Sequence, residues 1–364
     1  MKKGLSQTAW IGIAIVIIIV IVAAALMMGG GGETTNQTGG GAGGGAGGGG
    51  PTGTFTMYTG SSGGVYYPVG TKIAQVVTAY TNLTVNSQES GASVANANAI
   101  KSGDTDFAIM QSDVAYFAYN GLKLEDFDPN QGGSPVTNLR ALAALYPEPI
   151  QIIARADAGV QTIWDLPGKS VAVGNVGSGL YATAETILSA LTVNGQPLWD
   201  QITKVEKGYK DAGDDIKAGN VQVFFNVAGV PTPTVQQMAA QVDLVLVEVP
   251  DDAYQQLVSA GLGNVYVQLV IPANSYDFQP NDVKTLTVKA LLVASANVPN
   301  NVVYTFLDAM FSHLDEIRQA HARAADISLQ TALEGVSIPL HPGAVQFYQD
   351  KGLTVPQSLL PPSS

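Results

Sequence analysis

The chain has 364 residues, a formal net charge of −12 at pH 7, no cysteine, and only 13% charged residues. A phosphate-binding surface needs clustered cations, and the 17 Lys and Arg residues are scattered, so the composition argues against a nucleic-acid partner. The lack of cysteine excludes disulfides, thiolate metal sites and cysteine nucleophiles.

The first predicted element is an uncharged, mostly aliphatic run of 20 residues, Ala9–Met28. As a helix it is about 30 Å long, which is enough to cross a bilayer once. Lys2 and Lys3 precede it and no Lys or Arg follows before Lys72, so the positive-inside rule places the bulk of the chain outside the cell. A cleaved signal peptide, or a prepilin-type signal that keeps its apolar stretch, is the alternative. We therefore expect residues 1–28 to be a signal or membrane anchor.

A glycine-rich stretch follows the apolar run. Residues 29–53 contain 15 glycines in 25 positions, a composition typical of a flexible linker. The remaining 311 residues, 54–364, are too many for one simple core and suit two lobes. Two lobes imply a cleft between them.

Short apolar runs of strand type alternate with helical patterns through this part of the chain, which is the signature of an α/β fold. The predicted strands are 55–58, 107–110, 139–145, 150–155, 170–173, 221–227 and 242–249, and the predicted helices include 112–121, 178–191 and one with Ile73, Val76, Val77 and Tyr80 on one face.

The prolines at positions 147 and 149 separate two of these runs, Leu139–Leu145 and Ile150–Ala154. Proline disfavours the helical region for the residue before it, so the segment Tyr146-Pro147-Glu148-Pro149 is expected to be an extended crossing between lobes. The sequence thus predicts lobe 1 from residues 54–147 and 244–364 and lobe 2 from residues 148–243.

Three loops rich in Gly and Ser each precede a predicted helix, at 59–64, 90–93 and 174–179. Such loops offer free backbone N–H groups and a partial positive charge, which suit a carboxylate or phosphate oxygen at the carboxyl ends of strands. Taken singly, each loop is better explained as a Ser cap with a Gly turn. Their recurrence in both predicted lobes favours a shared anion site.

Arg140 and Arg155 flank the proposed crossing, and Arg155 is the better candidate for a bidentate carboxylate contact. The alternative is a solvated charge at the end of a strand. Tyr66, Tyr146 and Tyr181 lie next to the loops and are candidate pocket walls or ordinary buried aromatics.

Catalytic motifs are weaker. Gly60-Ser61-Ser62-Gly63-Gly64 satisfies G-x-S-x-G and precedes His341, the chain order of an α/β-hydrolase triad with Ser62 as nucleophile. In that fold the elbow follows several strands, whereas here it follows the first one. The histidines 313, 321 and 341 have no metal-ligand spacing and no P-loop lysine motif is present, so we expect no metal, no cofactor and no enzymatic activity.

Several stretches together resemble the TAXI family, the solute receptors of tripartite ATP-independent periplasmic (TRAP) transporters. The similar segments, in chain order, are 60–70, 91–96, 102–113, 139–148, 165–169, 177–179, 227–231 and 341–344.

The resemblance implies a two-lobed type II periplasmic-binding-protein fold that captures a small carboxylate, such as glutamate or a dicarboxylate, and delivers it to TRAP membrane subunits. The apolar run and the glycine-rich linker depart from the family, because many relatives have a cleaved signal instead. We expect a monomeric receptor outside the membrane, held by the N-terminal helix. A ligand-sensing ectodomain and a tethered serine hydrolase remain the alternatives. Besides Arg155, the expected ligand-binding residues are those of the similar segments, namely Ser62, Gly64, Tyr66, Ser93, Asn96, Gln111, Tyr146, Ser178, Gly179 and Gly229.

Overall fold

The computed structural model describes residues 50–362, which belong to one compact unit. Among the helices of these residues, none has both the length and the apolar character needed to cross a bilayer. The expected anchor, residues 1–28, and residues 29–49 of the expected linker lie outside the described residues.

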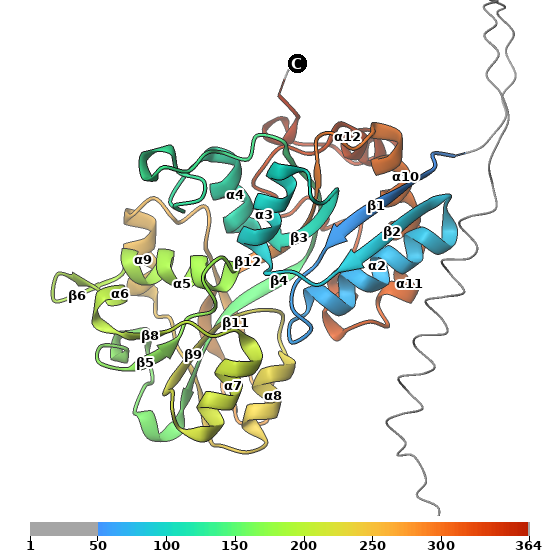
Figure 1. Ribbon diagram of the computed structural model, residues 1–364. Helices are drawn as coiled ribbons and strands as arrows, with labels where there is room; N and C mark the ends of the chain where they lie inside the picture. Colours follow the sequence, from blue (N-terminus) through green and yellow to red (C-terminus); the bar gives the residue numbers. More distant parts are fainter. Residues whose placement is uncertain (1–49, 363–364) are drawn as a thin grey trace, which may run out of the picture. The chain divides into compact units, whose positions relative to one another are not determined.

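One ten-stranded mixed sheet organises this unit, and we describe it in two halves (Figure 1). In the first half, parallel strands β2, β1 and β3 are followed by β12, which is antiparallel to β3. The edge strand β11 pairs with β12, and β12 pairs with the first part of β4. The strand bounds are β1 Gly53–Tyr58, β2 Leu83–Gln88, β3 Phe107–Gln111, β4 Leu139–Arg155, β11 Val267–Ile271 and β12 Val283–Ser295.

The second half of the sheet begins at the last residues of β4. There β4 pairs antiparallel with β9 on one side and β10 on the other, and parallel strands β5 and β8 extend the sheet beyond β9. A separate hairpin is formed by β6 and β7. The bounds are β5 Ser170–Ala172, β6 Thr192–Val193, β7 Gln196–Pro197, β8 Thr203–Val205, β9 Val223–Val227 and β10 Leu244–Val247. The predicted α/β class is confirmed, and the predicted lobe boundaries stay a prediction.

Strand β4 is one continuous strand of 17 residues, where the sequence predicted two strands separated by a crossing. The expectation of an extended path was correct, because proline favours extended backbone. The strand is not interrupted because β12 pairs alongside it from Leu139 to Pro149, with register shifts that absorb the irregularity. β4 therefore pairs with strands of both sheet halves and joins them.

Strands β2, β6, β7, β8, β11 and β12 were not predicted. The 13 residues of β12 include the polar or charged side chains Lys284, Thr285, Thr287 and Lys289, so the run has no uniform apolar pattern. From Ala290 to Ser295, however, every residue is buried between β3 and β4. Tertiary pairing thus decides a strand that local pattern leaves ambiguous.

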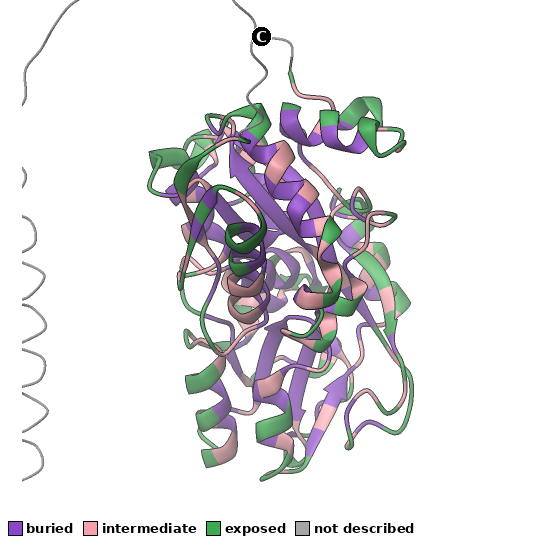
Figure 2. Cartoon of the chain, turned by 90° about the vertical axis from the view of Figure 1, so that its right-hand side faces the viewer, coloured by how far each residue is buried: buried purple, intermediate pink, exposed green. Residues whose placement is uncertain are grey.

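Helices cover the sheet, and many exposed residues lie on their outward faces, while the central strands β3, β4 and β9 are almost entirely buried (Figure 2). Helix α2 shows why: Val69, Ile73, Val76 and Val77 recur at helical spacing and are at most 1% exposed. The bounds are α2 Tyr66–Tyr80, α3 Ser93–Ser102, α4 Ser112–Asn120, α5 Gly179–Ala190, α6 Leu198–Gln201, α7 Tyr209–Ala218, α8 Pro233–Ala239, α9 Asp251–Ser259, α10 Asn300–Ser312, α11 Leu314–Ile317 and α12 Pro342–Asp350.

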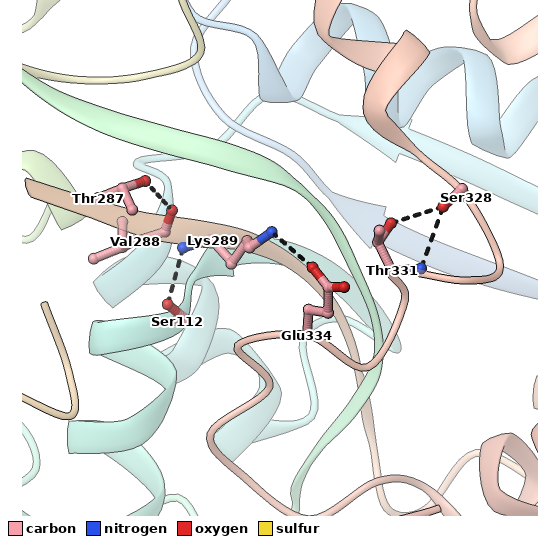
Figure 3. A network of polar contacts seen from close by, with 7 residues as sticks. All are labelled: Ser112, Thr287, Val288, Lys289, Ser328, Thr331 and Glu334. Carbon is pink, nitrogen blue, oxygen red and sulfur yellow. Dashed lines mark hydrogen bonds and ion pairs between the residues drawn. The ribbon is translucent and has the colours of Figure 1, made fainter. Parts of the chain in front are cut away.

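The segment after α11 returns to the first sheet half and packs beside the two long strands, β4 and β12 (Figure 3). Lys289 of β12 lies 3.9 Å from Glu334 across this contact. The backbone N–H of Lys289 also donates to Ser112 Oγ at 3.0 Å, and Ser337 Oγ donates to the Ser112 carbonyl at 2.8 Å. The start of α4 is thereby fixed to β12 and to the returning chain.

Candidate ligand-binding site

A small cavity lies where β1, β2, β3, β5 and β9 end and the chain turns into helices, with the middle of β4 as its floor. Ligands of open α/β sheets bind at such carboxyl ends of strands. The cavity volume is about 40 Å³. Its lining is Gly60, Ser61, Gly64, Val65, Tyr66, Ala92, Gln111, Glu148, Ser178, Gly179, Leu180, Tyr209, Val227 and Ala228.

Helix α5 presents its N-terminus to this cavity. Ser178 caps the helix: its Oγ accepts from the Tyr181 N–H at 3.1 Å and donates to the Asn175 carbonyl at 2.7 Å. The N–H groups of Gly179 and Leu180 lie in the first turn, where no intrahelical acceptor exists. Together with the helix dipole they form a place for an anionic oxygen.

The same turn of α5 touches the first sheet half closely. A Cβ on Gly179 would lie 2.1 Å from Gln111 Oε1 and 2.4 Å from Ser93 Oγ, so only glycine fits. The Ala95 N–H of α3 donates to the Gly177 carbonyl at 3.2 Å in the same contact. The cavity is therefore closed between the N-termini of α3 and α5.

Among residues 50–362, Glu148 is the only acidic residue that lines the cavity, and no Lys, Arg or His lines it. Its side chain is buried, with 2% of the residue exposed. Tyr66 Oη donates to Glu148 Oε2 at 2.6 Å. Burial raises the pKa of Glu148 to about 8, because the charged form loses water; the Tyr66 hydrogen bond opposes this shift and the nearby charge of Asp113 adds to it.

Three tyrosines surround this carboxyl. Tyr209 Oη donates to the Val227 carbonyl at 2.7 Å, which fixes its ring against the cavity. Tyr146 is 1% exposed and lies close enough for Glu148 and Tyr209 to raise its pKa, after burial itself, which contributes most. Within residues 50–362 the hydroxyl of Tyr146 has no hydrogen-bond partner.

Gln111 connects the cavity to a second buried carboxyl, Asp113. Gln111 Nε2 donates to Thr183 Oγ1 at 2.7 Å and approaches Asp113 Oδ1 at 3.4 Å, which orients the amide with Oε1 away from that network. Thr183 Oγ1 and Tyr266 Oη donate to Asp113 Oδ2 at 2.6 and 3.0 Å. This network ties α4 to α5 behind the cavity.

Five of the eleven residues expected from the sequence line the cavity. They are Gly64 and Tyr66 after β1, Gln111 at the end of β3, and Ser178 and Gly179 at the start of α5.

Three others support the walls rather than line them. Ser93 Oγ accepts from the Gln111 N–H at 3.1 Å. Asn96 Nδ2 donates to the Thr59 and Ile109 carbonyls, both at 2.8 Å, and so holds the β1 and β3 ends together. Tyr146 packs beside Glu148 as described above.

The last three expected residues lie elsewhere. Ser62 is exposed, and its backbone N–H donates to Glu89 at 2.6 Å. Gly229 is covered by Arg323 so closely that a Cβ at position 229 would lie 2.3 Å from the Arg323 Cγ. Arg155 pairs with Asp157 at 2.9 Å and donates to the Ile216 carbonyl at 2.9 Å, so the structure does not bring it to the cavity.

Glu148 and Tyr209 are the main lining residues that the sequence reasoning missed. Glu148 gives one signal, an acid between two prolines inside a long apolar run. Tyr209 gives none, because its position depends on how the chain after β8 folds back.

Among the described residues, Ser62 of the G-x-S-x-G motif has no histidine placed to act as its catalytic base. His341 is fully buried and caps α12, with Nδ1 accepting from the Gly343 N–H at 3.1 Å. Over residues 50–362 no hydrogen bond joins Ser62 to His341, and no cluster of three or more His, Asp or Glu side chains is placed to hold a metal.

A wider surface groove of about 580 Å³ lies beside the cavity, along α7 and α8. Its charged residues include Lys217 and Asp214, which pair with each other at 2.7 Å on the surface. Exposed pairs of this kind contribute little binding energy. The smaller cavity, which contains a buried carboxyl, is therefore the better candidate site.

A family model described as the NMT1-like family matches residues 57–352. Among solved structures, the alkanesulfonate-binding protein SsuA from Xanthomonas axonopodis pv. citri, bound to MOPS, has 14% identity and a TM-score of 0.47, over 82% of this chain and 90% of that chain. The periplasmic binding protein BugD has 15% identity and a TM-score of 0.48, over 74% of this chain and 86% of that chain.

Proposed function

The chain belongs to the NMT1-like family, and from that premise we propose that it is an extracytoplasmic solute receptor that captures a small carboxylate and delivers it to a membrane transporter. The observation that supports this most directly is the cavity at the strand ends, at whose wall the N–H groups of Gly179 and Leu180 have no intrahelical acceptor. Backbone N–H groups at a helix N-terminus bind carboxylate oxygens without any basic side chain.

The finer assignment follows the TAXI resemblance. The fold is then a two-lobed periplasmic-binding-protein fold of type II, the ligand a glutamate-like or dicarboxylate-like molecule, and the partner the membrane subunits of a TRAP transporter. The receptor works as a monomer and is held at the membrane by Ala9–Met28.

Capture requires the site to open. A cavity of about 40 Å³ holds no more than a few atoms, so a carboxylate enters only if the contact between α3 and α5 separates. β4 pairs with strands of both sheet halves and contains Glu148 near its centre, so we assign to β4 the role of hinge between the two halves. Closure then brings the α5 N-terminus onto the ligand.

The test is a thermal-shift measurement on the purified full-length chain in detergent, with L-glutamate, glutarate, 2-oxoglutarate, succinate, L-alanine and propionate. At least one of these is expected to raise the melting temperature, because binding to the folded state alone stabilises it. Neutral sugars serve as the negative set. A chain that none of the carboxylates stabilises is not the proposed receptor.

Site variants locate the binding. Gly179→Ala is expected to weaken binding at least about tenfold, because its Cβ collides with Gln111 and Ser93 on closure. Gly63→Ala is the matched control, since Gly63 does not line the cavity and its Cβ would meet nothing nearer than the Tyr209 Cβ at 3.6 Å. Arg155→Ala is expected to leave affinity unchanged. Normal affinity in Gly179→Ala would move the site away from this cavity.

A further inference from the structure

The cavity contains an acidic group without a partner of opposite charge among the described residues. Glu148 Oε2 accepts one hydrogen bond, from Tyr66, and within residues 50–362 its other oxygen, Oε1, has no hydrogen-bond partner. A buried carboxyl of this kind is costly unless something satisfies it. The described part of the chain supplies no basic side chain at the cavity wall.

Three side-chain donors of the cavity wall are engaged inside the protein, while the hydroxyls of Ser61 and Tyr146, which can donate or accept, have no partner among the described residues. Tyr66 Oη donates to Glu148, Tyr209 Oη to the Val227 carbonyl, and Gln111 Nε2 to Thr183. The acceptors Glu148 Oε1 and Gln111 Oε1 have no partner among the described residues. A cation beside Glu148 would favour its ionised form, and the side chains apart from the Ser61 and Tyr146 hydroxyls then offer only acceptors, while the backbone N–H groups in the first turn of α5 offer donors.

Aromatic rings complete this acceptor region. Tyr66 and Tyr209 line the cavity and Tyr146 packs beside Glu148. Aromatic ring faces attract cations, and a cage of tyrosines with a carboxylate is a general solution for binding an ammonium group. An ammonium has three donors and no acceptor, which complements what the side chains offer.

We propose that Glu148 accepts a protonated amine of the bound solute, so that the receptor selects small carboxylates with an amino group over carboxylates without one. This inference rests on the receptor function proposed above. The solute then lies with its carboxylate at the N-terminus of α5 and its amine between Glu148 Oε1 and Gln111 Oε1.

The other role open to Glu148 is that of a protonated acid, which donates a hydrogen bond to a second carboxylate of the ligand. The two roles predict different effects of Glu148→Gln on ligand binding. Glutamine keeps a donor for a carboxylate but removes the negative charge that an ammonium requires. The variant therefore distinguishes an amine acceptor from a carboxylate donor.

The experiment is isothermal titration calorimetry on the full-length chain with two pairs of probes that differ only in the amine, L-glutamate with glutarate and L-alanine with propionate. In whichever pair binds, the aminated member is expected to bind at least about tenfold more tightly. Glu148→Gln is expected to reduce that ratio by about tenfold. Glu185→Gln, which removes a half-buried carboxyl of α5 outside the cavity, is expected to leave the ratio unchanged.

Equal or tighter binding of glutarate or propionate by the unmodified chain would overturn the amine assignment while leaving the receptor function standing. An unchanged ratio in a folded Glu148→Gln variant would overturn it too. If no probe of either pair and no other carboxylate binds, the receptor function falls and the amine assignment falls with it. If Glu148→Gln does not fold, the ratio measured on the unmodified chain decides alone.

Discussion

Two carboxyls are buried near the same cavity, and their surroundings differ. Asp113 is 1% exposed and accepts hydrogen bonds from Thr183, Tyr266 and the Val114 N–H at 2.6 to 3.0 Å. Glu148 is 2% exposed and accepts one, from Tyr66. A buried acid whose oxygens both accept hydrogen bonds from the protein is part of the scaffold. A buried acid at a cavity wall with an oxygen that lacks a donor is available to a ligand.

The positions of the two acids explain the difference. Asp113 lies in the first turn of α4, where α5 and the residue before β11 both pack against it, so donors from distant segments converge. Glu148 lies in the middle of β4, where the strand passes from one sheet half to the other, and it faces the space that the helix termini leave open.

The largest expected effect comes from Asp113→Ala. It leaves the hydroxyls of Thr183 and Tyr266 buried without their acceptor, and we expect a loss of about 5 kcal/mol in the free energy of unfolding. Urea denaturation followed by circular dichroism measures the loss. Asp113→Asn, which keeps one oxygen acceptor, is expected to lose about half as much. A loss below about 1 kcal/mol in Asp113→Ala would show that the network is not part of the scaffold.

The next effect is a gain in the free energy of unfolding, and its size depends on pH. The pKa of Glu148 is raised from 4.5 to about 8 in the folded chain, so between these values the native state holds a proton that the unfolded chain has lost. Stability must then fall as pH rises through this window and level off above about 8. Glu148→Gln has no proton to lose, so it should equal the unmodified chain near pH 5 and exceed it near pH 9, by on the order of 4 kcal/mol.

Few other groups at the site titrate in this window. Burial and the neighbouring Glu148 charge raise the pKa values of Tyr66, Tyr146 and Tyr209 further from neutrality. Burial also raises the pKa of Asp113, against the effect of its hydrogen bonds. Asp113 is present in both proteins, so its contribution cancels in the comparison, apart from the Coulomb interaction that it has with Glu148. Denaturation curves of both proteins across the pH range test the prediction. A difference that does not change with pH would contradict it.

The sequence predicts the alternation of strands and helices well, because the deciding signals are local. The spacing of Val69, Ile73, Val76 and Val77 is sufficient for α2, and the Gly and Ser loops mark where helices begin. Strand β12 was not predicted because its burial comes from pairing with β3 and β4, which are distant in sequence. The continuity of β4 across its prolines has the same cause.

The cavity was predictable only in part, for a related reason. Helix N-termini are visible as motifs, so Gly64, Ser178 and Gly179 were found. Glu148 and Tyr209 depend on which side chains meet across the strand ends, and no local pattern encodes that. Arg155 was favoured as a carboxylate ligand from its place at a strand end, yet Asp157 and the Ile216 carbonyl already occupy its guanidinium.

The smallest expected effects come from two variants that each remove a tyrosine hydroxyl, one that donates to Glu148 and one that donates to Asp113. In Tyr66→Phe, Glu148 loses the single hydrogen bond that lowers its pKa, so the pKa should rise and the fall of stability with pH should move to more alkaline values. In Tyr266→Phe, Asp113 keeps the donors Thr183 and Val114, so the expected result is a loss of about 1 kcal/mol with little change in pH dependence. Denaturation at several pH values separates the two, because losing one donor of several lowers stability, whereas losing the sole donor also shifts the pH at which the acid ionises. Identical pH profiles for both variants would mean that the number of partners does not distinguish the two carboxyls.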